Sequence, residues 1–172
     1  YFGQISHFAS NKLQLKPEFL NSLDREINIY LLTDLCKIAK EVGFSNEEIM
    51  KMGAWSFRLN KESDLGSSLS LFDDIKEMFK EICDNYSKKF DLNFDYKLVK
   101  ASNSRLVIRS KISDLCLDKF NGEFVGSEMT DLAKVGVIST FSCYMNKPQS
   151  YVLKTHCIYQ GDPYTQYMVN LS

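Results

Sequence analysis

The side chains best suited to chemistry in this sequence are five cysteines and two histidines. No two of the cysteines form a CxxC pair, and they stand at positions 36, 83, 116, 143 and 157. A scattered, odd-numbered set is typical of reduced thiols that pack as small hydrophobic residues in the cytoplasm. His156 and Cys157 are adjacent, so on a strand their side chains point to opposite faces and do not form a nucleophile–base pair. Cys116 or Cys143 could meet His156 through the fold, which leaves a thiol-dependent enzyme or reductase as an alternative.

Other catalytic and cofactor patterns were sought among the remaining residues. The chain contains no GxxxxGK[ST], GxGxxG, HExxH or GxSxG motif. The adjacent acids Asp73-Asp74 and Glu47-Glu48 are typical of helix starts, where they complement the helix dipole. The sequence has only two histidines, which limits metal-binding and acid–base proposals: His156 is expected on a strand and His7 in an N-terminal arm. We therefore expect no cofactor and no enzymatic activity.

Composition narrows the class of protein. The chain has 172 residues, 44% of them hydrophobic and 25% charged, and this suffices for one domain with a hydrophobic core. A net charge of −1 argues against a general nucleic-acid-binding protein. No apolar run approaches the ~20 residues of a membrane span, and no signal-peptide pattern is present. We expect a cytoplasmic protein, and the start at Tyr1 rather than Met indicates a fragment of a longer polypeptide.

The first half of the chain has helical periodicity. Pro17 is expected to open a helix that ends at Gly43, with the apolar stripe Leu20, Leu23, Ile27, Leu31, Leu35 and Ile38. The stretch from Ser45 to Glu48 predicts a capping box, followed by a short helix towards Trp55. Residues 60–68 are polar and predict a loop, and a second long helix is expected over residues 69–90.

The second half alternates between strand and helix patterns. A hairpin is expected around Ser102-Asn103-Ser104, helical spacing from Cys116 to Met145, and a second hairpin around Gly161-Asp162-Pro163. Gly122, Gly126 and Gly136 would let another backbone approach closely. Because the strands pair locally, we predict an α+β fold in which helices pack on one side of an antiparallel sheet built from two hairpins.

Aromatic residues are abundant, with 12 Phe, 9 Tyr and 1 Trp. Such side chains either fill a core or line an apolar cavity, and composition does not separate the two. If a cavity exists, spacing and aromatic content nominate as ligand-binding residues Trp55, Phe72, Phe79, Phe124, Phe141 and Tyr144.

The C-terminal hairpin has a recognisable pattern, of which CIYQGDPYTQY, residues 157–167, is the most specific piece. With a helix that opens at Cys116 and has small residues at Gly122 and Gly126, it resembles the 4-vinyl reductase domain. The resemblance covers residues 45–172, and residues 116–170 carry the specific pattern. It implies a ligand-binding domain at residues 45–172, preceded by an arm and helix at residues 1–44 that could serve dimerisation.

The resemblance also implies a fold shared with haem–nitric-oxide sensors and with subunits of the TRAPP tethering complex, the NO-signalling/Golgi-transport-like fold. Such domains are typically homodimers that hold a small apolar or aromatic molecule between helices and sheet. In bacteria they often precede the output domains of transcription activators, histidine kinases or nucleotide cyclases.

Phenol-sensing members of that family hold zinc through a helix cysteine, an acid and two hairpin cysteines. Position by position, the acid corresponds to Lys154, the first hairpin cysteine to Cys157 and the second to Thr165. Tetrahedral zinc needs four N, S or O donors, so the resemblance implies a vestigial site that has lost its metal.

These arguments predict a sensory or regulatory domain that binds a small hydrophobic ligand and signals through a dimer to an output domain outside this chain. It would bind no nucleic acid itself and would not span a membrane. The alternative from another class is a non-catalytic adaptor or structural protein on the same fold, with its cavity filled by its own side chains.

Overall fold

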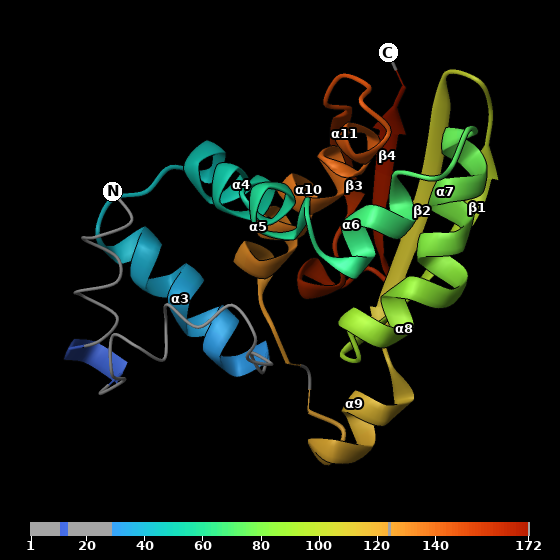
Figure 1. Cartoon of the computed structure of the whole chain (residues 1–172). Helices are drawn as coiled ribbons and strands as arrows, with labels where there is room; N and C mark the ends of the chain where they lie inside the picture. The colour runs from blue at the N-terminus through green and yellow to red at the C-terminus, as the bar shows by residue number, and fades with distance from the viewer. Residues whose placement is uncertain (1–10, 14–28, 124, 172) are drawn as a thin grey trace.

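The computed structural model describes residues 11–13, 29–123 and 125–171 (Figure 1), and for Phe90 only the backbone. The expected N-terminal arm, apart from a helical turn at residues 11–13, and the first part of the helix from Pro17 lie outside these residues. The described part is an antiparallel sheet with helices packed on it, which confirms the predicted α+β class. No helix among the described residues is long and apolar enough to cross a membrane.

The sheet has four strands in the order β1-β2-β4-β3. They are β1 (Phe94–Ala101), β2 (Arg105–Ile112), β3 (Tyr151–His156) and β4 (Thr165–Asn170). Both predicted hairpins are present, and antiparallel pairing of β2 with β4 joins them. Gly161 has φ of +95°, a backbone conformation that glycine adopts without strain, and it ends a short 3₁₀ turn between β3 and β4.

One face of the sheet is buried against the helices. Side chains alternate between faces along a strand, and the inward ones on β2 and β4 are Leu106, Ile108, Ser110, Ile112, Thr165, Tyr167 and Val169. The outward positions include Arg105 and Lys111, which are exposed. The core therefore lies in one layer between this face and the helices that Figure 1 shows in front of it.

From residue 29 onward, the structure begins with four helices. They are α3 (Ile29–Glu41), α4 (Asn46–Ala54), α5 (Ser56–Asn60) and α6 (Asp64–Leu69). Gly43 follows α3 with φ of +93°, as expected of a helix-ending glycine. The capping box before α4 is confirmed, since Ser45 accepts a hydrogen bond from the Glu48 backbone and Glu48 accepts one from the Ser45 backbone.

The prediction of a loop over residues 60–68 is wrong, because α6 occupies its second half. Ser63 caps this helix by accepting a hydrogen bond from the backbone N–H of Gly66. Leu69 at its end is almost fully buried in the main core. The polar composition of this segment therefore did not reveal a short capped helix, which a few apolar side chains anchor to the main core.

The second long helix begins at residue 75 rather than 69, because Asp74 caps it by accepting a hydrogen bond from the Lys76 backbone. It runs through α7 (Ile75–Glu81), a π-helical segment η1 (Ile82–Tyr86) and α8 (Ser87–Phe90). A π segment inserts one residue into the helix and is frequent at functional sites. Here it changes which side chains face the sheet.

The single helical stretch expected from Cys116 to Met145 is divided. It consists of α9 (Asp114–Lys119), α10 (Glu128–Ser139) and α11 (Phe141–Tyr144). Asn121 at φ of +53° and Gly122 at +77° end the first piece, because left-handed residues do not continue an α-helix. Ser127 and Thr130 then form a capping box that starts α10.

Helices α4 and α10 cross at two glycines. A Cβ atom on Gly136 would lie 1.8 Å from the Met50 carbonyl oxygen, and one on Gly53 would lie 1.8 Å from that of Ala133. The predicted close backbone approach at Gly136 is confirmed, whereas Gly53 was not foreseen. At Gly122 the space around a Cβ is open, so that glycine serves the turn and not a close approach.

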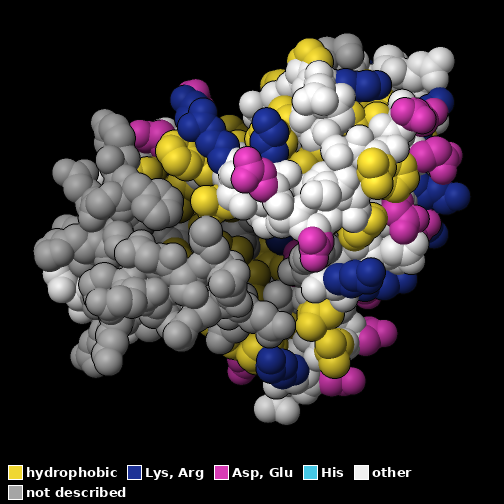
Figure 2. Space-filling model, viewed as in Figure 1, with side chains coloured by type: hydrophobic (Ala, Val, Ile, Leu, Met, Phe, Trp, Pro, Cys, Tyr) yellow, Lys and Arg dark blue, Asp and Glu magenta, His cyan; other side chains and the backbone are white. Residues whose placement is uncertain are grey.

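Charged side chains of both signs are mixed on the surface. Figure 2 shows basic and acidic groups interspersed over the described part of one face. That face carries no patch of a single sign among the residues drawn in colour, in keeping with the near-zero net charge.

Candidate ligand-binding cavity

A cavity of about 440 Å³ lies between the helices and the buried face of the sheet. Its walls come from α3, α5, α6, the π segment, α10 and α11, with Ile108 of β2 and Tyr96 of β1 on the sheet side. Most of the lining is apolar, including Leu65, Leu69, Ile82 and Val137. This combination of apolar walls and a few polar groups is typical of small-molecule sites.

Two stretches of helix form much of the wall. On α10 and α11 the lining residues are Lys134, Val137, Ile138, Phe141 and Tyr144. The first four have the spacing of residues that share one face of a helix. On the opposite side the π segment and the residue after it contribute Ile82, Cys83, Tyr86 and Ser87. The π segment thus supplies lining side chains from two successive turns.

Lys134 is the one lysine or arginine among the described residues that line the cavity. Its side chain is only 10% exposed, and its Nζ has no hydrogen-bond partner within the described part of the chain. The ammonium lies 2.7 Å from the centroid of the Phe94 ring and 4.0 Å from Oδ1 of Asp131. Burial lowers the pKa of Lys134 to about 8, against the opposing effect of Asp91 and Asp131.

Asp131 lies one turn before Lys134 on α10 and is fully buried. The Thr165 hydroxyl donates to its Oδ2 at 2.8 Å, and the Tyr167 hydroxyl donates to its Oδ1 at 3.2 Å. The Cys157 thiol lies 3.5 Å from Oδ2. Several donors on the β3–β4 hairpin therefore satisfy this carboxylate.

The three residues mapped onto the zinc hairpin lie close together around Asp131. Lys154 Nζ is 3.5 Å from Cys157 Sγ and 3.4 Å from Oε1 of Glu128. Cys157 and Thr165 both donate to Asp131. Across the described residues no group of three His, Cys, Asp or Glu side chains is arranged to hold a metal ion. The ammonium group of Lys154 lies beside the Cys157 thiol, at the place where the resemblance would put a zinc ion.

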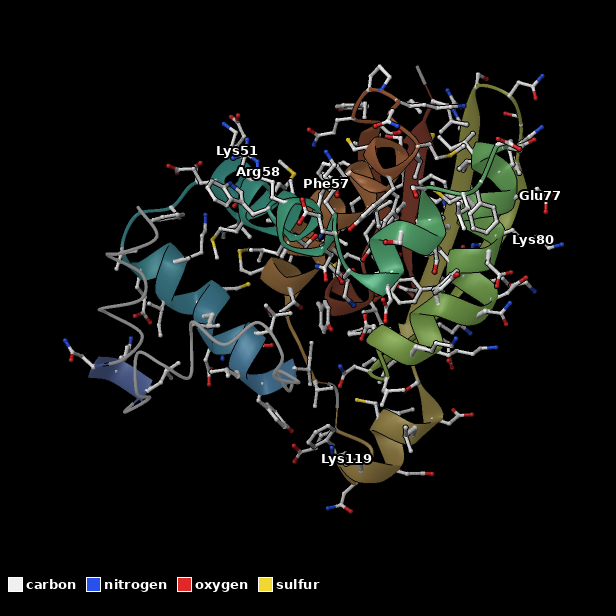
Figure 3. All side chains as sticks on the ribbon, in the orientation of Figure 1. Lys51, Phe57, Arg58, Glu77, Lys80 and Lys119 are labelled. Carbon is white, nitrogen blue, oxygen red and sulfur yellow. The ribbon has the colours of Figure 1, made fainter. Side chains whose placement is uncertain are left out.

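Two of the six aromatic residues nominated from the sequence line the cavity, Phe141 and Tyr144. Tyr144 meets Phe57 edge-on with ring centroids 4.9 Å apart. Figure 3 shows Phe57 on the inner side of α5, whereas Lys51 and Arg58 project from the outer surface of α4 and α5. Ligand contact by Phe141 and Tyr144 remains a prediction.

The other nominated residues lie elsewhere. Trp55 is 51% exposed, and the Arg58 guanidinium lies 5.1 Å from its ring centroid. Phe79 is fully buried in the core, edge-on to Phe141, and Phe72 is half-buried against the same core. These three therefore do not line this cavity, and Phe124 lies outside the described residues.

Lys134 was missed in the sequence, although a signal was present. It is a single charged residue within the apolar run Ala133-Lys134-Val135-Gly136-Val137-Ile138. A lysine in such a run is either at the edge of a helix or buried, and buried lysines are uncommon unless they have a function or a partner.

The thiols are poorly suited to nucleophilic chemistry. Burial raises the pKa of Cys36 to about 11 and that of Cys83 to about 12. Burial also raises the pKa of Cys116, of Cys143 and of Cys157. Because the thiolate is the nucleophile, all five cysteines are held in their less reactive form.

Comparison with known proteins identifies the fold. No family model and no curated protein sequence matches this chain. Its structure is similar to the Fe(II) unliganded H-NOX protein from K. algicida, with a TM-score of 0.61 and 12% identity over 99% of this chain and 94% of that one. It is also similar to an oxygen-binding H-NOX domain related to soluble guanylate cyclases, with a TM-score of 0.59 and 12% identity over 100% and 86% of the two chains.

A third similar structure is the phenol-responsive sensory domain of the transcription activator PoxR, crystallised with phenol. Its TM-score is 0.55 and its identity 12%, over 84% of this chain and 75% of that one. The resemblance to the 4-vinyl reductase domain thus led to the correct fold, although no family model supports that family name.

The H-NOX relatives raise the question of haem, which the cavity residues answer. No histidine or methionine occurs among the described residues that line the cavity. His156 lies on β3, where its ring is near Gln166 and Tyr164. Burial raises the pKa of the Cys83 thiol to about 12 and that of the Tyr96 phenol well above its usual value, which keeps both protonated. The described lining does not fit a haem held by an axial histidine. The chain has the H-NOX-like α+β fold.

Proposed function

We propose that this chain is a sensory domain that binds a small, largely apolar molecule in the cavity between helices and sheet. The observation that carries the proposal is the cavity itself, about 440 Å³ in size and lined mostly by apolar side chains. A protein that needed only a scaffold would gain stability by filling such a space, since empty apolar volume is costly. The PoxR domain, crystallised with phenol, supports the same role for this fold.

The domain would act without catalysis. The five neutral thiols and the lack of a histidine in the described cavity lining support this part of the proposal. The rival function, an adaptor with a filled interior, is disfavoured by the open space beside α10 and α11.

Signalling would follow from a population shift. A ligand that binds one arrangement of the helices more tightly than another stabilises that arrangement by the difference in affinity. We propose a cytoplasmic homodimer that passes this change to an output domain outside the chain, as expected of a transcription regulator. The PoxR relative, part of a transcription activator, supports this view.

Native mass spectrometry of the purified protein tests the proposal. The spectrum is recorded before and after denaturation, and the solvent extract is examined for a released compound. Val137→Phe places a ring into the cavity wall, and Val99→Phe on the exposed side of β1 is the matched control. A co-purified or added apolar compound should bind to the native protein and the Val99 variant but not to the Val137 variant.

Binding of equal strength in both variants would contradict the cavity as the site. Failure to bind any apolar or aromatic compound from a broad set would favour the adaptor alternative. The oligomer peaks of the same spectra test the homodimer independently.

A further inference from the structure

The cavity has a polar region in which Lys134 Nζ finds no hydrogen-bond acceptor among the residues that the structure describes. Near it, the Tyr96 hydroxyl donates to Oδ2 of Asp91 at 2.6 Å, and Asn93 donates to Oδ1 of Asp91 at 3.3 Å. The Ser87 hydroxyl donates to the Cys83 carbonyl at 3.0 Å. These polar groups of the lining are thus paired within the protein. Within the described ranges, Lys134 Nζ meets aromatic rings and, at 4.0 Å, Asp131.

An unpaired buried donor costs free energy that a ligand can recover. Leaving a charged group without hydrogen bonds is more costly than leaving a neutral one. Lys134 is part of the cavity wall, while its Nζ lies beneath the surface of that wall. The side chain is flexible, so a ligand acceptor would meet Nζ once the end of the side chain turns toward the cavity. A protonated Nζ donates hydrogen bonds and cannot accept them. The ligand atom that pairs with it therefore has to be a hydrogen-bond acceptor.

The charge of the ligand follows from the neighbours of Lys134. Asp131 lies 4.0 Å away, and Asp91 is close enough to favour the protonated amine electrostatically. Two carboxylates beside one ammonium already leave a net negative charge in this region. A further carboxylate on the ligand would add repulsion, while a neutral oxygen would not.

We propose that Lys134 donates a hydrogen bond to the carbonyl oxygen of a neutral, otherwise apolar ligand. This proposal rests on the proposed function and deepens it by naming the ligand class: ketones, esters and similar compounds with one carbonyl group. The apolar walls formed by Leu65, Leu69, Val137 and Phe141 would hold the rest of the molecule.

Three naphthalenes of the same shape test the proposal by fluorescence titration of the full chain. They are 2-acetylnaphthalene, with a neutral carbonyl; 2-naphthoate, with a carboxylate; and 2-ethylnaphthalene, with no acceptor. The acetyl compound should bind the native protein about tenfold more tightly than the ethyl compound, as expected for one hydrogen bond to a charged donor. The naphthoate should bind no more tightly than the ethyl compound.

Lys134→Met keeps the length of the side chain and removes the donor. It should abolish the advantage of the acetyl compound over the ethyl compound, so that the two bind the variant with equal affinity. Lys111→Met, on the exposed face of β2, is the matched control and should change neither affinity. A thermal melt verifies that each variant is folded, and the three-probe comparison on the native protein decides the matter even if the Lys134 variant does not fold.

Each outcome distinguishes this proposal from the proposed function. Equal binding of the acetyl and ethyl compounds would overturn the role of Lys134 while the binding cavity stands. Tightest binding of naphthoate would show that Lys134 selects anions and would also overturn the proposal. Binding of none of the three, in a protein that binds no other apolar compound, would remove the proposed function and this inference together.

Discussion

Asp131 and Lys134 lie one turn apart on α10, and both are almost completely shielded from solvent, yet their surroundings differ. Asp131 faces the β3–β4 hairpin, where hydroxyl groups of Thr165 and Tyr167 donate to it. Lys134 lines the cavity, and in the described part of the chain its Nζ meets the rings of Phe94 and Tyr96 and, at 4.0 Å, Oδ1 of Asp131. A buried charge with its partners holds a structure together, and a buried charge without them is available to a ligand.

The largest expected effect comes from Asp131→Asn, which removes the carboxylate that accepts hydrogen bonds from Thr165 and Tyr167. The amide removes one of the two carboxylates that favour the buried Lys134 charge, and it disturbs the hydroxyl donors of β4. We expect a loss of about 3–5 kcal/mol in the free energy of unfolding, measured by urea denaturation. Asp95→Asn on exposed β1 is the control and should stay within about 0.5 kcal/mol of the native value. A small loss for Asp131→Asn would place the main support of the hairpin elsewhere.

The pH dependence of the stability of Lys134→Met tests the effect of the buried Lys134 charge. The pKa of Lys134 is about 8 in the folded protein and near 10.5 in the unfolded chain, so the unfolded chain binds more protons between these values. The burial of Lys134 therefore lowers the free energy of unfolding below pH 8, and this destabilisation disappears as pH rises from 8 to 10.5. Relative to the native protein, the methionine variant should be most stable below pH 8 and should lose that advantage by pH 10.5.

The change in this difference should be a few kcal/mol at most, because each unit of pKa shift corresponds to about 1.4 kcal/mol. The charged or titratable groups near Lys134 are Asp91, Asp131, Cys116 and Tyr96, and all four remain in the variant. Urea denaturation at several pH values provides the measurement. A constant difference between the two proteins across this range would show that Lys134 titrates normally and is hydrated.

Gly136→Ala tests the face of α10 opposite the cavity, on which the positions of both charges depend. In an open helix this change would stabilise by about 0.5–1 kcal/mol, but here the new methyl meets the Met50 carbonyl. We expect a loss of about 1–3 kcal/mol from overpacking, measured by thermal and urea denaturation. The sign decides the matter, since a gain in stability would mean that α4 and α10 are not in backbone contact.

The smallest effect is expected for Trp55→Ala. Half of the Trp55 side chain is exposed and it does not line the cavity, so the affinity for the naphthalenes should not change. The free energy of unfolding should change by about 0.5 kcal/mol or less. Phe141→Ala, on the cavity wall, is the contrasting variant and should alter affinity. Equal losses of affinity in both would extend the binding site to the surface of α4.

Local signals predicted much of the fold. The capping box at Ser45, the helix-ending Gly43 and the turns of both hairpins depend on neighbouring residues alone, and all were correct. The helix of residues 64–69 was missed because a single serine cap and buried Leu69 outweigh a polar composition. The break after residue 120 was missed because it requires left-handed Asn121 and Gly122, which helical spacing does not reveal.

The candidate site was harder to predict because it depends on contacts between distant segments. Phe141 and Tyr144 line the cavity, while Phe79, chosen by the same criterion, is a core residue. Whether an aromatic ring faces a cavity or a neighbour depends on helix rotation, and the π segment alters that rotation by one residue. The surroundings of Lys134 combine two rings of β1 with Asp131 of its own helix and Asp91 from the segment before β1, so they depend on how distant segments meet.

The glycine crossing of α4 and α10 has a mechanical consequence. Where side chains separate two helices, rotamer changes can absorb a small displacement, but Gly53 and Gly136 bring backbone against backbone. We therefore expect the two helices to move together as one rigid unit. A ligand that pushes on the cavity side of α10 would tilt α4 with it, and the exposed ring of Trp55 at the end of α4 is where that motion would emerge at the surface.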